Sequence, residues 1–228
     1  MASDGTTQLQ RSQADRRARI MAGARTLVAN GGAAALSMRK LADEAGLSVN
    51  TIYNLIGDRD AVLGALVDHG LGRLATATAH LVDAADPLEA ILERTRTAVR
   101  LARQDAPSFR ALALAVHEHR GQVGASSLPA MLRAEQMALP LLERARAEGA
   151  LELEIDPVRL GRRLHDGFFV ALESWARRRT NGPGFEDEAL YSATLTLLGG
   201  ASVLHRPGLF RRLIALQDRG RKPKRGQA

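Results

Sequence analysis

The chain of 228 residues contains no cysteine, few prolines and few aromatic residues. Without cysteine it can have neither disulfide bonds nor thiolate catalysis, and no zinc or iron–sulfur site built on cysteine. It has no apolar run near the roughly 20 residues that span a bilayer and no apolar signal-peptide core, so a cytoplasmic location is expected. The scarcity of proline, together with abundant Ala, Leu and Arg, predicts a mostly helical protein.

The net charge of +7 is concentrated at one end of the chain. Residues 205–228 contain eight Lys or Arg and a single Asp, which leaves equal numbers of basic and acidic residues in the rest. The basic tail therefore gives no independent evidence of nucleic-acid binding elsewhere. A solvated terminus is the simpler interpretation of the tail, and contacts with DNA phosphates or anionic lipids are the alternative.

Helix start and stop signals divide the chain into four parts. Residues 1–11 show no periodicity and are expected to be a disordered lead. Residues 12–60 contain three short helical patterns with capping residues and glycine stops. Residues 61–204 continue as longer helical patterns broken by Pro and Gly, and residues 205–228 form the basic tail. No pair of strand patterns and no internal repeat occurs, so the predicted fold class is all-α.

Residues 37–60 place two short helical patterns around the turn Ala45-Gly46-Leu47-Ser48. This is the layout of a helix-turn-helix, whose second helix enters the major groove of DNA. Helical spacing turns Ile52 of the second helix inward and Tyr53 outward. Asn side chains on the outer face can bond adenine, and hydroxyl groups can reach phosphates. The predicted DNA-binding residues are Arg39, Ser48, Val49, Asn50, Thr51, Tyr53, Asn54 and Arg59.

The segment resembles the N-terminal domain of the TetR family of bacterial transcriptional regulators. The matching motifs are Asn30-Gly31-Gly32, the run SMRKLADEAGLS from Ser37 to Ser48, Thr51-Ile52-Tyr53 and Arg59-Asp60-Ala61-Val62-Leu63. The resemblance covers about residues 12–67. It implies a three-helix helix-turn-helix DNA-binding domain followed by a larger helical ligand-binding and dimerisation domain. It also implies a dimeric repressor that a small apolar ligand releases from a palindromic operator.

Two positions depart from the family pattern. Where the family usually has His or Tyr followed by Phe, this chain has Leu55 and Ile56. Ile56 keeps a core residue of smaller volume, whereas Leu55 cannot donate a hydrogen bond to a phosphate. We therefore expect a helix-turn-helix with an altered set of backbone contacts. An isolated helical hairpin with glycine turns would share part of this pattern, and the ordered motifs from Ser37 to Arg59 argue against it.

Two helical patterns, Val158–Arg179 and Glu186–Leu204, are the predicted pairing surface, because the resemblance implies a four-helix bundle between subunits. The alternative is that they cover the core of one subunit. The predicted interface residues are Leu164, Phe168, Leu172, Trp175, Leu190, Leu197, Ala201 and Leu204. The resemblance further implies a ligand pocket in the helices between about 88 and 150. Its predicted lining is Phe109, Leu112, Val116, Met131, Met137, Leu141, His165 and Phe169, although such residues are more often plain core.

No arrangement of residues indicates catalysis, a metal or a cofactor. His117 and His119 are two residues apart, so on a helix they point to different faces and cannot chelate one metal ion. No nucleophile motif and no phosphate-binding glycine loop occurs. The expected partners are double-stranded DNA, a second copy of the chain and an unknown small effector, without stable membrane insertion. The alternatives are an enzyme with a helical pocket and a non-specific nucleic-acid or membrane-surface binder acting through the basic tail.

Overall fold

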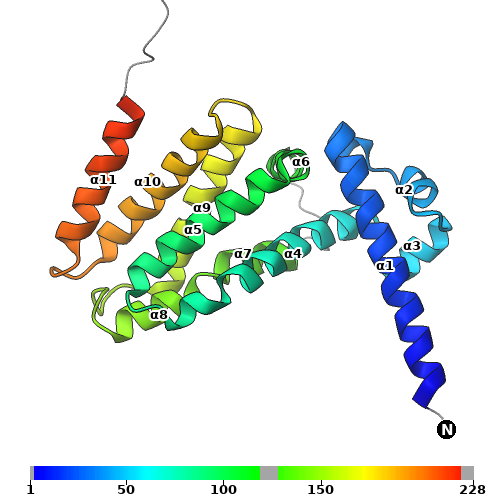
Figure 1. Ribbon diagram of the computed structural model, residues 1–228, viewed down its shortest axis with the longest axis horizontal. Helices are drawn as coiled ribbons and strands as arrows, with labels where there is room; N and C mark the ends of the chain where they lie inside the picture. The colour runs from blue at the N-terminus through cyan, green and yellow to red at the C-terminus, as the bar shows by residue number, and fades with distance from the viewer. Residues whose placement is uncertain (1–2, 119–127, 222–228) are drawn as a thin grey trace, which may run out of the picture. The chain divides into compact units, whose positions relative to one another are not determined.

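A computed structural model describes residues 3–118 and 128–221 of the chain, and the side chains of residues 8, 10–114 and 132–219. Its described residues form α-helices, two short 3-10 helices and one isolated bridge between Leu151 and Ala201, without a β-strand (Figure 1). The predicted all-α fold class is confirmed. Among the described residues, no helix combines the length and apolarity needed to cross a bilayer.

The chain divides into two compact units. The N-terminal unit comprises residues 1–71 with 105–131, and the C-terminal unit comprises residues 72–104 with 132–228. The predicted boundary at residue 60 differs from this division, because the following helix continues in the N-terminal unit as far as Leu71. The N-terminal unit also includes a helix after residue 105, which the sequence pattern assigned to the regulatory part.

The N-terminal unit is built around α1 (Ser3–Gly31), which begins well before the predicted start near Ser12. The other elements are η1 (Ala33–Ala35), α2 (Met38–Ala45), α3 (Val49–Leu55), the first part of α4 (Arg59–Thr78) and α6 (Ala106–Glu118). Ile20, Leu41, Ile52 and Val62 are completely buried and pack into one core that draws on α1 to α4. Helix α6 contributes Ala111 to the same core and lies against α1.

The predicted caps set the ends of α2 and α3. The Ser37 hydroxyl accepts a hydrogen bond from the Lys40 amide at 3.2 Å, and the Ser48 hydroxyl accepts one from the Thr51 amide at 3.1 Å. Gly46 ends α2 in the left-handed conformation, with φ 61° and ψ 42°. The Leu47 amide then donates to the Ala42 carbonyl at 3.0 Å, a Schellman closure that fixes the turn between the two helices.

The C-terminal unit holds the remaining helices: the end of α4, η2 (Ala79–Asp83), α5 (Pro87–Gln104), most of α7 (Leu128–Gln136), α8 (Leu139–Ala147), α9 (Pro157–Ala176), α10 (Gly182–Gly200) and α11 (Arg206–Arg221). Helix α10 is apolar on most sides because it packs against α5, α9 and α11 (Figure 1). The core includes Ile91, Leu142 and Leu197, each at most 1% exposed.

Two helices of this unit begin where local chemistry favours a start. Helix α8 is separate from α7, and Pro140 lies in its first turn. Proline is favoured at that position because its missing amide has no helical acceptor there. Helix α10 starts at Gly182 rather than Glu186, because the Asn181 side chain caps it by accepting from the Gly184 amide at 2.8 Å.

Candidate nucleic-acid interface

Helix α3 has one exposed polar face and one buried apolar face. Its Ile52 is 0% exposed, whereas Tyr53 on the opposite face is 49% exposed. Asn50 and Asn54 are exposed beside Tyr53, as predicted for a helix that reads base edges. Val49 is partly buried against the core of the N-terminal unit, so much of its surface is used for packing.

The hydroxyl groups at the start of α3 are bonded to each other. Ser48 Oγ and Thr51 Oγ1 lie 2.8 Å apart, and Ser48 Oγ also accepts from the Thr51 amide. Ser48 therefore stabilises the first turn of α3. Either hydroxyl can still turn one lone pair or proton toward an outside group.

Arg59, a predicted DNA contact, is also bonded within the N-terminal unit. Arg59 Nη2 donates to the Ala33 carbonyl at 2.8 Å and Nε donates to the Leu36 carbonyl at 3.0 Å. Nη1 lies 3.8 Å from the Asp60 carboxylate. The guanidinium therefore donates to the Leu36 carbonyl at the C-cap of η1 and is a second donor to the Ala33 carbonyl, which also accepts from the Leu36 amide at 3.1 Å. The sequence carried no sign of this role, because Arg59 and its acceptors are more than 20 residues apart.

Arg39, a predicted DNA-binding residue, is exposed on α2, and so is its neighbour Lys40. Sequence analysis missed Arg19 of α1, whose Nη2 donates to the Gly46 carbonyl at 3.0 Å. This bond ties α1 to the turn between α2 and α3. Helical periodicity cannot indicate such a contact, because an exposed arginine on α1 has no local pattern that selects its partner.

Most of the residues predicted to pair two subunits lie in the core of one subunit. Those that are at most 9% exposed are Leu164, Leu172, Trp175, Leu190, Leu197 and Ala201. Phe168 contacts the Phe185 ring, with centroids 5.9 Å apart, and Leu204 is 88% exposed beyond the end of α10. The apolar stripes of α9 and α10 therefore face each other and α5, which is the alternative that the sequence left open. On their outer sides these helices expose Val170 and Leu195.

The predicted ligand-lining residues are divided between the two units. Leu112 packs against the core of the N-terminal unit, and Phe109 of α6 lies near Gly70 of α4 in that same unit. In the C-terminal unit, Leu141 is buried in the core, and the rings of His165 and Phe169 are 6.3 Å apart. Met137 is partly buried where α7 gives way to α8. The side chains of Val116 and Met131 lie outside the described residues.

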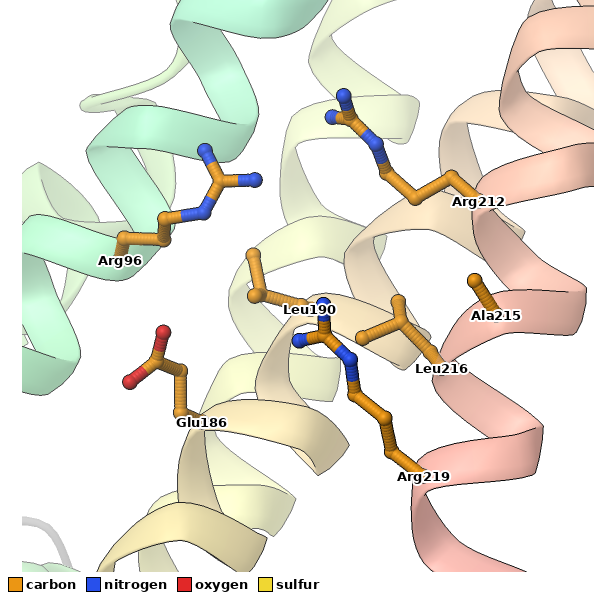
Figure 2. A pocket seen from close by; sticks show the side chains of 7 residues that line it. All are labelled: Arg96, Glu186, Leu190, Arg212, Ala215, Leu216 and Arg219. Carbon is orange, nitrogen blue, oxygen red and sulfur yellow. The ribbon is translucent and has the colours of Figure 1, made fainter.

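A cavity of about 350 Å³ lies between α5, α10 and α11, away from the predicted lining. Its walls carry three arginines, with Arg96 and Glu186 on one side and Arg212 and Arg219 of α11 on the other (Figure 2). Acidic residues offset all three charges. Arg96 bonds Glu89 and Glu93, Arg212 lies beside Glu89, and Arg219 lies 3.8 Å from Asp187. Ion pairs that join α11 to α5 and α10 therefore account for this cluster.

The N-terminal unit presents a capped helix-turn-helix, the arrangement of a class of DNA-binding domains. Residues 20–66 match the family model for bacterial regulatory proteins of the tetR family. No curated protein matches the chain.

Solved structures share this fold over most of the chain. Thermus thermophilus FadR, a TetR-family transcriptional repressor in complex with lauroyl-CoA, is 23% identical, with a TM-score of 0.66 over 80% of this chain and 94% of that one. A TetR-family regulator from Mesorhizobium loti is 17% identical, with a TM-score of 0.61 over 83% and 98% of the two chains. A fatty acid degradation regulator, FadR from Bacillus halodurans, is 16% identical, with a TM-score of 0.66 over 80% and 94%. Residues 20–66 are thus similar to the tetR family, and over the rest of the chain the likeness to solved structures is one of fold.

Proposed function

We propose that the protein is a dimeric repressor that binds a palindromic operator and leaves it when a small ligand binds. The exposed polar face of α3 carries this proposal. Its backbone is fixed by the Ser48 cap and by Ile52, which is completely buried. Asn50, Tyr53 and Asn54 therefore extend from a rigid support, and such rigidity is what base readout requires.

The DNA contacts divide into two kinds. Asn50 and Asn54 can each present an amide to the N6 and N7 atoms of adenine, which supplies sequence preference. Tyr53, Arg39 and Lys40 are exposed donors suited to phosphates, which supply position and affinity. Arg59 acts indirectly, because its hydrogen bonds to Ala33 and Leu36 hold η1 against the start of α4.

Pairing of two subunits would use the outer faces of α9 and α10 rather than their buried stripes. Val170 is 59% exposed and Leu195 is 50% exposed, on neighbouring helices. The two helices approach closely at Gly167, where a Cβ atom would lie 2.0 Å from the Ser192 hydroxyl. A second copy could cover Val170 and Leu195 with its own α9 and α10.

The effector would have an apolar body. This part of the proposal is supported by the helical C-terminal unit, by its aliphatic core, and by the similarity to a repressor whose structure contains lauroyl-CoA. A ligand that binds one arrangement of the protein better than another shifts the population between them, and so changes DNA affinity. No catalytic step is required for this function.

The DNA-binding proposal is tested with palindromes from the DNA that flanks the coding region. Full-length protein should bind one of them specifically in a shift assay at controlled salt. Tyr53→Ala should weaken that binding roughly 10-fold to 100-fold, a typical loss for one good contact. Leu153→Ala is the matched control, because Leu153 is an exposed side chain of the C-terminal unit, at 76%. Unchanged affinity of Tyr53→Ala would reject the proposed reading surface.

The pairing surface is tested separately by sedimentation. Val170→Glu combined with Leu195→Glu should convert a dimer into a monomer, because four carboxylates would be buried without partners. Leu153→Glu adds the same kind of charge at an exposed position and should leave the dimer intact. A double variant that remains dimeric would place the interface elsewhere.

A further inference from the structure

Helix α1 is packed along only part of its length. Ile20, Ala24 and Val28 are completely buried in the core of the N-terminal unit. Of residues 11–19, by contrast, none is buried and all but Ser12 are exposed. At a rise of about 1.5 Å per residue, this exposed part extends α1 by roughly 13 Å. In Figure 1 the dark-blue end of the helix continues beyond α2 and α3.

The exposed part of α1 is basic. Residues 11–19 contain four arginines and one aspartate, whereas residues 1–204 as a whole have no net charge. Arg16 and Arg17 have no acidic residue three or four positions away, which is the spacing at which side chains on a helix pair. Neither makes an ion pair within the part of the chain that the structure describes. Both charges are therefore available to a partner outside the chain.

Helical spacing sets the direction of these two arginines. Arg16 lies four residues before Ile20 and Arg17 lies three before it, so both belong to the side of α1 that is buried farther along the helix. Arg19, one turn after Arg16, donates to the Gly46 carbonyl at 3.0 Å, in the turn that leads into α3. This side of α1 thus changes from apolar packing to unpaired positive charge next to the turn before α3.

We propose that Arg16 and Arg17 bind phosphates of the DNA that flanks the bases read by α3. Contacts to phosphates fix the register of a reading helix on the duplex without selecting a sequence. Guanidinium groups suit this role, because each can donate two parallel hydrogen bonds to one phosphate. The inference rests on the proposed function, since it assigns the exposed part of α1 to the same DNA interface.

The test measures salt dependence on two duplexes: the palindrome bound in the shift assay, and a scrambled duplex of the same length and composition. In the full-length protein, Arg16→Gln combined with Arg17→Gln should weaken binding to both duplexes by the same factor, roughly 10-fold to 100-fold. The slope of log affinity against log salt should become shallower by about 2 for each bound subunit, because each phosphate contact contributes about 0.9. Arg16→Lys combined with Arg17→Lys retains both charges and should retain the slope.

Arg25→Gln is the matched control on the same helix. Arg25 is exposed and lies five residues after Ile20, on the side of α1 that faces away from the core, so its replacement should leave the slope unchanged. The inference is overturned if the double Gln variant keeps the wild-type slope, or if Arg25→Gln changes the slope as much. It is also overturned if the double Gln variant loses affinity for the palindrome alone.

Failure of the proposed function gives a different result. Wild-type protein that binds the palindrome no better than the scrambled duplex would reject the proposed repressor function. Wild-type preference for the palindrome, together with any of the three contrary results above, rejects only the role of α1.

Discussion

The turn between α2 and α3 allows a sharp test of how α1 supports helix α3. Gly46 has φ 61°, and a Cβ atom there would lie 2.7 Å from Nη2 of Arg19. Gly46→Ala should therefore have two effects. It forces a non-glycine residue into the left-handed conformation, and it displaces the guanidinium that donates to the Gly46 carbonyl.

The magnitude follows from comparison with a second glycine. Gly149 follows α8 with φ 73°, and an added Cβ there would meet nothing within 4 Å. Gly149→Ala should cost only the conformational strain, about 1 kcal/mol. At Gly46 the lost hydrogen bond adds to the same strain. Because that bond is exposed, its contribution is about 0.5–1 kcal/mol, which brings the cost of Gly46→Ala to roughly 2 kcal/mol.

The assay must report on each unit separately. The single tryptophan, Trp175, lies in α9, so its fluorescence during urea unfolding follows the C-terminal unit. Hydrogen exchange of amides in α2 and α3 gives the local free energy of opening in the N-terminal unit. A double-mutant cycle completes the test. Arg19→Ala should cost about 0.5–1 kcal/mol in the wild-type protein and close to nothing in Gly46→Ala. Additive costs, or equal costs for Gly46→Ala and Gly149→Ala, would refute the argument.

Two further predictions concern single side chains. Arg59→Met should reduce the free energy of opening of the N-terminal unit by about 2–3 kcal/mol, because two carbonyls of η1 and its C-cap lose a charged donor. Arg59→Lys should recover less than half of this lost free energy of opening. Hydrogen exchange measures the opening free energy of both variants. Weaker DNA binding with an unchanged free energy of opening would show instead that Arg59 contacts DNA directly. Phe185→Ala should destabilise the C-terminal unit by about 3–5 kcal/mol, since a completely buried aromatic ring is removed. Phe185 stacks on Trp175 with centroids 5.0 Å apart, so tryptophan emission should also shift to longer wavelength, and an unchanged spectrum would contradict this packing.

Local chemistry explains which features could be predicted from the sequence. Ser37 and Ser48 cap helices because their hydroxyls reach amides three residues ahead, and Gly46 ends α2 because it adopts a positive φ with little strain. The outward position of Tyr53 and the inward position of Ile52 follow from helical periodicity. These features depend on neighbours within a few residues, which is why the helix-turn-helix was recognisable.

Features that depend on distant neighbours were not predictable. An apolar stripe shows that a side of a helix is buried, but it does not show whether a second subunit or another helix of the same chain covers it. The stripes of α9 and α10 fit both possibilities, and the structure buries Leu164, Leu190 and Leu197 inside one subunit. In the same way, the sequence could not tell that Arg59 donates to backbone carbonyls and that Arg19 donates to the Gly46 carbonyl.

The sequence by itself therefore determined the all-α fold class and the ends and outer face of α3, because capping, turn geometry and periodicity are local properties of the chain. Only the tertiary structure decided how each charge is used. A guanidinium can bind a carbonyl, a carboxylate, a phosphate or water. Which of these it binds depends on the groups that folding brings within about 3 Å. Arg19 and Arg59 are chemically identical, yet Arg19 bonds the turn after α2 and Arg59 bonds the backbone around η1, because folding places different acceptors beside each.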